Sequence, residues 1–85
     1  MRELPVVTLY TRKRCHLCEA AREVIDDVRE DHPFELEVFD VDADASLRAR
    51  YHHDVPVVCV AGEVKFVHRV TAEALTEALA AATRA

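Results

Sequence analysis

The chain has 85 residues, 51% of them hydrophobic, with one glycine and three prolines. This composition predicts one folded domain over residues 1–85 and leaves no room for a second module. The net charge of −5 without a long basic stripe argues against a nucleic-acid or membrane surface, and the apolar run 4–9 is too short for a signal peptide or a membrane span, so we expect a cytoplasmic monomer.

The first predicted element is a strand at residues 4–10, a short β-branched and aromatic run that a polar stretch at 11–14 ends. A helix is predicted from Cys15 to about Asp31. Its apolar residues recur at the spacing of one helix face: Leu17, Ala21, Val24, Ile25 and Val28. The pair His32-Pro33 should close it, because the residue before proline avoids the helical region.

A second strand is predicted at residues 34–41, where apolar and acidic residues alternate. Asp42 and Asp44 can then cap a short helix that runs to about His52, with Leu47 and Tyr51 as its buried pair. Because strand, helix and strand follow one another, we expect the first two strands to pair in parallel.

Two further strands are predicted at residues 57–60 and 64–68, joined by a tight turn at Ala61-Gly62. Thr71 is a suitable N-cap for a last helix, whose apolar positions are Leu75, Ala78, Leu79 and Ala82. The predicted fold class is therefore α/β, in the order β-α-β-α-β-β-α, with a four-stranded mixed sheet and helices on both faces.

The pair Cys15 and Cys18 falls where the first strand ends and the first helix begins. At a helix start, residues three apart share a face, and the unpaired N–H groups favour a thiolate. Lowering a cysteine pKa from about 8.5 to about 7 takes roughly 2 kcal/mol, of which the helix end supplies about 1. The basic run 12–14 and His16 should supply the rest, whereas Cys18, beside the apolar stripe, should be more buried and act as the resolving thiol.

Several segments in their order along the chain resemble the glutaredoxin family: residues 10–18, residues 38–42, Val55-Pro56-Val57 and the hairpin at Gly62. The resemblance implies a thioredoxin-like fold and a redox-active dithiol made by Cys15 and Cys18. It implies that Pro56 is cis and that Val55 offers backbone groups to a thiol substrate. It also places Arg12 at the basic position that contacts the glutathione carboxylate.

The chain departs from that family at two places. Residues 66–71 lack the glycine pair and aspartate that hold glutathione, so we expect glutathione as a possible co-substrate and no tightly bound cofactor. His16 stands where proline commonly follows the first cysteine, and its imidazole could donate to the Cys15 thiolate and tune its pKa.

The leading interpretation is a thiol-disulfide oxidoreductase that reduces protein disulfides or glutathione mixed disulfides, with a reductase or glutathione as electron donor. It predicts a place in cell redox homeostasis and electron transport. One alternative is an iron-sulfur or metal carrier that uses Cys15; another is a non-catalytic thioredoxin-fold interaction module. No zinc site is expected, because a closed site needs two more ligands, and Cys59 among valines is interpreted as core.

Overall fold

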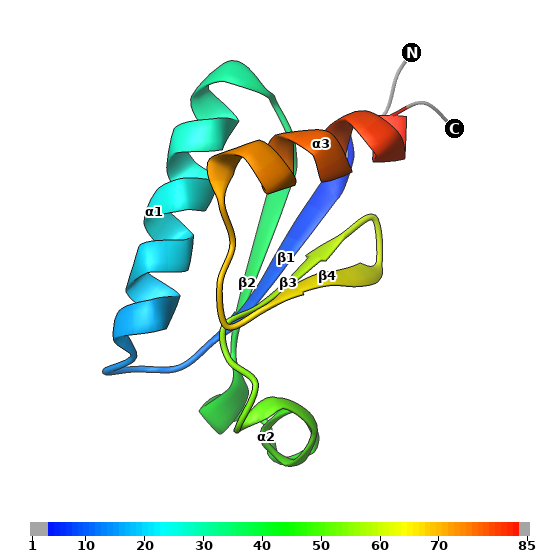
Figure 1. The fold of residues 1–85 in the computed structure, drawn as a ribbon. Helices are drawn as coiled ribbons and strands as arrows, with labels where there is room; N and C mark the ends of the chain where they lie inside the picture. Colours follow the sequence, from blue (N-terminus) through cyan, green and yellow to red (C-terminus); the bar gives the residue numbers. More distant parts are fainter. Residues whose placement is uncertain (1–3, 84–85) are drawn as a thin grey trace.

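The structure is a computed structural model and describes residues 4–83. Four strands and three α-helices follow one another with one short 3-10 helix, η1, in the order β1 (Val6–Thr11), α1 (His16–Asp31), β2 (Glu35–Asp40), η1 (Val41–Ala43), α2 (Ala45–Tyr51), β3 (Val57–Val60), β4 (Glu63–Val67) and α3 (Ala72–Thr83) (Figure 1). The sheet order is β2-β1-β3-β4. This is the α/β mixed sheet that the sequence predicts.

The pairing of the strands brings three chain segments to one edge of the sheet. β1 and β2 run parallel, with Thr11 opposite Asp40, and β3 runs antiparallel to β1, with Val57 opposite Tyr10. The end of β1, the end of β2 and the start of β3 therefore meet at the same edge. The loop that leads into α1 leaves the sheet there, and so does the Val55-Pro56 segment that enters β3.

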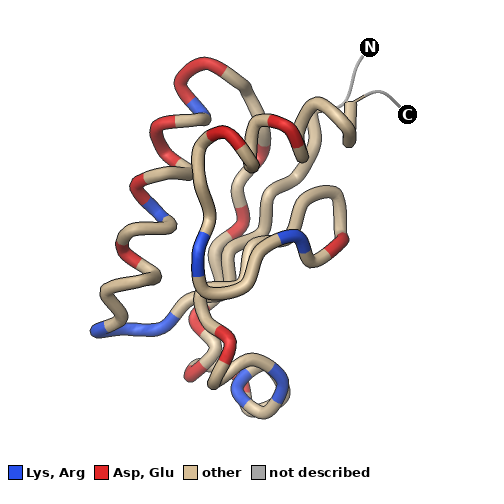
Figure 2. The backbone as a smooth tube through the Cα atoms, viewed as in Figure 1, with Lys and Arg blue, Asp and Glu red and all other residues tan. Residues whose placement is uncertain are grey.

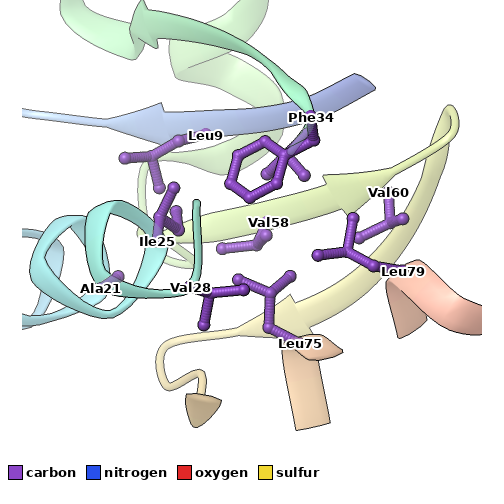
Figure 3. Close-up of a cluster of buried hydrophobic side chains, with 10 residues drawn as sticks. Leu9, Ala21, Ile25, Val28, Phe34, Val58, Val60, Leu75 and Leu79 are labelled. Carbon is purple, nitrogen blue, oxygen red and sulfur yellow. The ribbon is translucent and has the colours of Figure 1, made fainter. Parts of the chain in front are cut away.

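One face of the sheet is covered by α1 and α3, and the main hydrophobic core lies between them and the strands (Figure 3). Ile25 of α1 and Leu75 of α3 are fully buried. The buried members of this core are Val7, Leu9, Ala21, Ile25, Val28, Phe34, Val58, Val60, Leu75 and Leu79. The apolar stripes predicted for the first and last helices are thus the faces that pack on the sheet, except that Leu17 is 38% exposed, because it lies in the first turn of α1 beyond the main core.

The short helix α2 lies at the sheet edge where β1 ends (Figure 1) and contacts the opposite face through aromatic stacking. Tyr10 alternates with Leu9, so it points away from the main core. Its ring stacks on Tyr51 of α2, with centroids 4.6 Å apart, and on Phe39 of β2 at 5.7 Å. Helices are therefore present on both faces, as predicted, but α2 contacts its face only near one end.

The element bounds agree with the predicted ones to within two residues, and the differences have local causes. β1 extends to Thr11 because this residue still pairs with Asp40 of the parallel neighbour. The first helix begins at His16, since Cys15 has an extended backbone and serves as the N-cap. The last strand is Glu63–Val67 rather than 64–68, because His68 turns away with a φ of 71°.

The prediction for the second helix was wrong in two respects. Asp44 alone caps α2, accepting hydrogen bonds from the backbone N–H groups of Ser46 at 2.8 Å and Leu47 at 3.1 Å, while Asp42 lies inside η1. Leu47 and Tyr51 are half-buried rather than buried, because a helix of seven residues at the end of the sheet has little surface to pack against. No helix within residues 4–83 is both long and apolar enough to cross a bilayer.

Candidate active site

The first turn of α1 is closed by the side chain of Cys15. This residue has φ −119° and ψ 106°, and its Sγ accepts a hydrogen bond from the backbone N–H of Cys18 at 3.2 Å. Its carbonyl accepts the first helical hydrogen bond, from Glu19 at 3.0 Å. A sulfur thus occupies the place that a serine or aspartate oxygen takes at an ordinary N-cap, where backbone N–H groups favour negative charge.

The sulfurs of Cys15 and Cys18 lie within disulfide-bonding distance, with their Cα atoms 5.2 Å apart. That Cα separation falls inside the range of about 4.4 to 6.8 Å that disulfides span. The side chains differ in exposure: Cys18 is only 3% exposed, whereas Cys15 is half-buried at the protein surface. An incoming sulfur can therefore reach Cys15 and not Cys18, the asymmetry that the sequence predicts.

His16 follows the first cysteine, but its ring points into solvent. The side chain is fully exposed, and its Nδ1 lies 3.6 Å from a carboxylate oxygen of Glu19. The hydrogen bond found on Cys15 Sγ comes from the Cys18 backbone and not from the imidazole. A role for His16 in tuning the pKa of Cys15 stays a prediction.

Arg12 joins three parts of the chain beside the cysteines. Its Nε and Nη2 donate to the two carboxylate oxygens of Asp42, at 3.1 and 2.6 Å, and its Nη1 donates to the carbonyl of His52 at 3.0 Å. The hydrogen bonds from Arg12 hold the pKa of Asp42 below its usual value. Arg12 therefore braces the end of β1 against η1 and α2, and its contact with a substrate carboxylate stays a prediction.

The Val55-Pro56 peptide bond is cis, as the family resemblance implied. The backbone N–H of Val55 donates to the carbonyl of Tyr51 at 3.2 Å. Pro56 is buried and directly precedes β3, at the same sheet edge as the loop that carries Cys15. The structure thus brings Val55 and Pro56, two of the three predicted substrate-binding residues, to the edge that holds the cysteine pair.

His68 holds this loop in a way that sequence reasoning missed. Its backbone N–H donates to the carbonyl of Pro56 at 2.8 Å, and its Nε2 lies 3.0 Å from the carbonyl of His53. The residue adopts a φ of 71°, in the left-handed region that few residues other than glycine enter, although histidine, asparagine and aspartate do so more often than the rest. A single histidine after an edge strand carries no spacing signal, so its role could not be predicted from the sequence.

An open hollow of about 230 Å³ lies beside the cysteine pair. Its wall combines the half-exposed Val38 of β2 and the buried Leu9 of β1 with several basic side chains. Ten residues line it: Leu9, Thr11, Arg12, Lys13, Arg14, Cys15, Cys18, Glu19, Arg22 and Val38.

The remaining chemistry-bearing side chains are dispersed. Within residues 4–83, no group of three or more His, Cys, Asp or Glu side chains is placed to hold a metal ion. Cys59 is buried in the middle of β3, and burial raises the pKa of its thiol. It lies on the sheet face opposite the main core, as its register partner Thr8 does.

Comparisons with known proteins agree with this geometry. Residues 6–80 match the family described as Glutaredoxin-like domain (DUF836). A Dictyostelium discoideum protein named as glutaredoxin-like is 32% identical over 75 residues, which cover 81% of this chain and 69% of that protein.

Solved structures give the same fold. A protein from X. campestris is 31% identical with a TM-score of 0.74, over 88% of this chain and 96% of that one. A protein from Nitrosomonas europaea is 25% identical with a TM-score of 0.77, over 93% and 95%. A thioredoxin from Halobacterium salinarum, 22% identical with a TM-score of 0.67 over 95% and 76%, shares the fold.

Proposed function

This chain belongs to the glutaredoxin-like family of the thioredoxin superfamily, and we propose from that membership that it is a thiol-disulfide oxidoreductase acting on protein disulfides or glutathione mixed disulfides. The observation that carries the proposal is the Cys15–Cys18 pair at bonding distance, with the first sulfur accessible at a helix N-cap and the second buried. Such a pair can exist as a dithiol or a disulfide without moving the backbone far.

The proposed reduction has two exchange steps. The Cys15 thiolate forms a bond to one sulfur of the substrate disulfide, and the other substrate sulfur leaves as a thiolate. Cys18, after giving up its proton, forms a bond to Cys15 Sγ and releases the second substrate sulfur. The substrate gains two electrons and the protein becomes a disulfide, which a thiol or dithiol donor must reduce for another turnover.

The groups around the pair support binding of a sulfur-bearing substrate. The carbonyl of Val55 accepts no backbone hydrogen bond within residues 4–83, whereas the Val55 N–H already donates to the carbonyl of Tyr51. We propose that a substrate cysteine pairs its backbone N–H with that carbonyl, next to Pro56. Arg12 retains donors beyond those used on Asp42 and His52, since a guanidinium carries five.

The experiment that tests the proposal uses the reduced protein and a peptide disulfide. Cys15→Ser should abolish reduction, while its hydroxyl still caps α1, so a loss of activity is not a loss of fold. Cys18→Ser should form a mixed disulfide with the peptide that accumulates, because the resolving thiol is gone. Unchanged reductase activity in Cys15→Ser would instead favour a non-catalytic interaction module.

The electron donor is identified by a second assay. We propose glutathione as co-substrate or a protein reductase as donor, with no tightly bound cofactor. Turnover is compared with glutathione plus glutathione reductase and with thioredoxin reductase alone. Activity with only one system assigns the donor, and a coloured, iron-containing preparation would contradict the dithiol assignment in favour of a cluster carrier.

A further inference from the structure

The hollow beside the cysteine pair lies on the opposite side of Cys15 from the cis-proline loop. β1 is central at this end of the sheet, with β2 on one side and β3 on the other. Val38, in the wall of the hollow, belongs to β2, whereas Pro56 directly precedes β3. When the reacting cysteine of a polypeptide lies next to Pro56, the hollow can therefore be reached only by the substrate residues on the side of that cysteine that faces away from Pro56.

The lining of the hollow carries four basic side chains and one carboxylate, that of Glu19, in an otherwise acidic protein. Figure 2 shows the basic run between β1 and α1 as one continuous positive segment. Lys13 and Arg14 take part in none of the ion pairs found within residues 4–83. The other basic lining residues are partly neutralised, since Arg12 pairs with Asp42 and Arg22 pairs with Asp26 at 3.1 Å.

The floor of the hollow is apolar. Val38 is 41% exposed although it lies on the sheet face that packs against the helices. Its register partner Leu9 is almost fully buried and also lines the hollow. The surface next to Cys15 thus combines an accessible aliphatic patch with unpaired positive charge, which complements an acidic segment that also carries an aliphatic side chain.

We propose that this hollow is a substrate-recognition subsite for polypeptide disulfides whose reacting cysteine is flanked by acidic and aliphatic residues. A substrate carboxylate approaches Lys13 and Arg14, and a neighbouring aliphatic side chain covers Val38. The inference rests on the proposed function, because it assigns a substrate class to the same cysteine pair.

The test compares two peptide disulfides that differ only in having two glutamates or two lysines beside the cysteine. The reduced wild-type protein should reduce the acidic peptide about five to ten times faster at low ionic strength, given the usual size of exposed charge interactions. In the double variant Lys13→Glu/Arg14→Glu the ratio should fall to about one or below. Salt at about 0.5 M should also reduce the wild-type ratio.

The ratio of the two rates is the informative quantity. Any effect of these substitutions on the reactivity of Cys15 itself acts on both peptides equally and cancels in the ratio. Lys65→Glu is the matched control for Lys13→Glu alone, since each reverses one lysine charge and Lys65 lies on the exposed strand β4, across the sheet from β2. This control should keep the wild-type ratio.

The apolar floor is tested with a leucine or a serine beside the two glutamates. The wild-type protein should favour the leucine peptide about threefold, as expected for partial burial of an aliphatic group, and Val38→Ser should remove that preference.

The outcomes separate the inference from the proposed function. Equal rates on the acidic and basic peptides, or a preference that Lys13→Glu/Arg14→Glu leaves intact, would overturn the subsite. Failure to reduce either peptide would overturn the oxidoreductase assignment itself.

Discussion

At the scale of single residues, the Arg12–Asp42 pair makes a pH-dependent contribution to stability. Hydrogen bonds from Arg12 lower the pKa of Asp42 below its ordinary value of 3.8. Because the folded pKa is depressed, the contribution is complete above the unfolded pKa and is lost as the pH falls through the lower folded value. Asp42→Asn should therefore reduce the free energy of unfolding near neutral pH, and its difference from wild type should shrink below about pH 4.

Urea unfolding at a series of pH values measures this effect. Asp27→Asn is the control, because Asp27 is exposed on α1 and is in none of the ion pairs found within residues 4–83. A constant difference between Asp42→Asn and wild type over the whole acidic range would show that the carboxylate charge contributes nothing.

Cys59 makes the free energy of unfolding depend on pH in the opposite direction from Asp42. Burial raises the pKa of its thiol above the ordinary value of 9.0, so the folded protein keeps a proton that the unfolded chain releases. Stability should thus fall as the pH rises above about 9. Cys59→Val should remove this alkaline loss, whereas Cys59→Ser should cost about 1 to 3 kcal/mol near neutral pH, because it buries a hydroxyl.

The oxidised protein is the sample for this measurement, since Cys15 and Cys18 then do not titrate. The difference in unfolding free energy between wild type and Cys59→Val is recorded at neutral and alkaline pH. Both proteins carry Tyr10→Phe in this comparison, because burial also raises the pKa of Tyr10 and the charge of Cys59 contributes to that shift, so Tyr10 would not cancel in the difference. A difference independent of pH would contradict the prediction.

At the scale of secondary structure, α2 depends on its cap. A seven-residue helix is too short to be stable in isolation, and Asp44 satisfies two of its free N–H groups. Asp44→Ala should cost about 1 kcal/mol of unfolding free energy, and Asp44→Ser should recover most of it. Denaturant unfolding of the three proteins is the measurement, and equal midpoints for the alanine and serine variants would refute the capping role.

Helix length also explains how much of the fold could be predicted. α1 has sixteen residues, so its apolar stripe repeats over four turns and fixes both the helix and its buried face. α2 has fewer than two turns, and the pair Leu47 and Tyr51 could not show how much sheet would be there to cover them. The parallel pairing of β1 and β2 followed from the strand-helix-strand order.

The candidate site was predictable only where its parts are close in sequence. Cys15 and Cys18 lie three residues apart, at the N-cap and in the first turn of α1, so the local geometry of a helix start brings their sulfurs together. Arg12 and Asp42 are separated by 30 positions, and nothing in either residue indicates the other. The hydrogen bond that holds Pro56 could not be predicted. Its donor is the backbone N–H of His68, and every residue except proline carries that group.

At the scale of the whole molecule, an 85-residue domain has little stability to lose. The free energy of unfolding of such a domain is about 5 to 10 kcal/mol. Leu75 is fully buried where α3 meets the core. Leu75→Ala should cost about 2 to 5 kcal/mol and lower the melting temperature by roughly 4 to 8 °C per kcal/mol. Glu77→Ala, on the exposed side of the same helix, should change stability by less than about 0.5 kcal/mol.

Thermal unfolding followed by circular dichroism compares the two variants. Similar melting temperatures would mean that α3 does not close the core as Figure 3 shows it.

The N-cap of α1 has a consequence for how the protein can be observed. The backbone N–H of Cys18 donates a hydrogen bond to Cys15 Sγ, with 3.2 Å between the nitrogen and the sulfur. Cys15 Sγ is the atom whose charge changes on reduction. A thiolate accepts a hydrogen bond more strongly than a disulfide sulfur does, so reduction should slow deuterium exchange at this one amide. The exchange rate of this one backbone proton therefore reports the redox state of the cysteine pair, and NMR can measure it without any label on the sulfur.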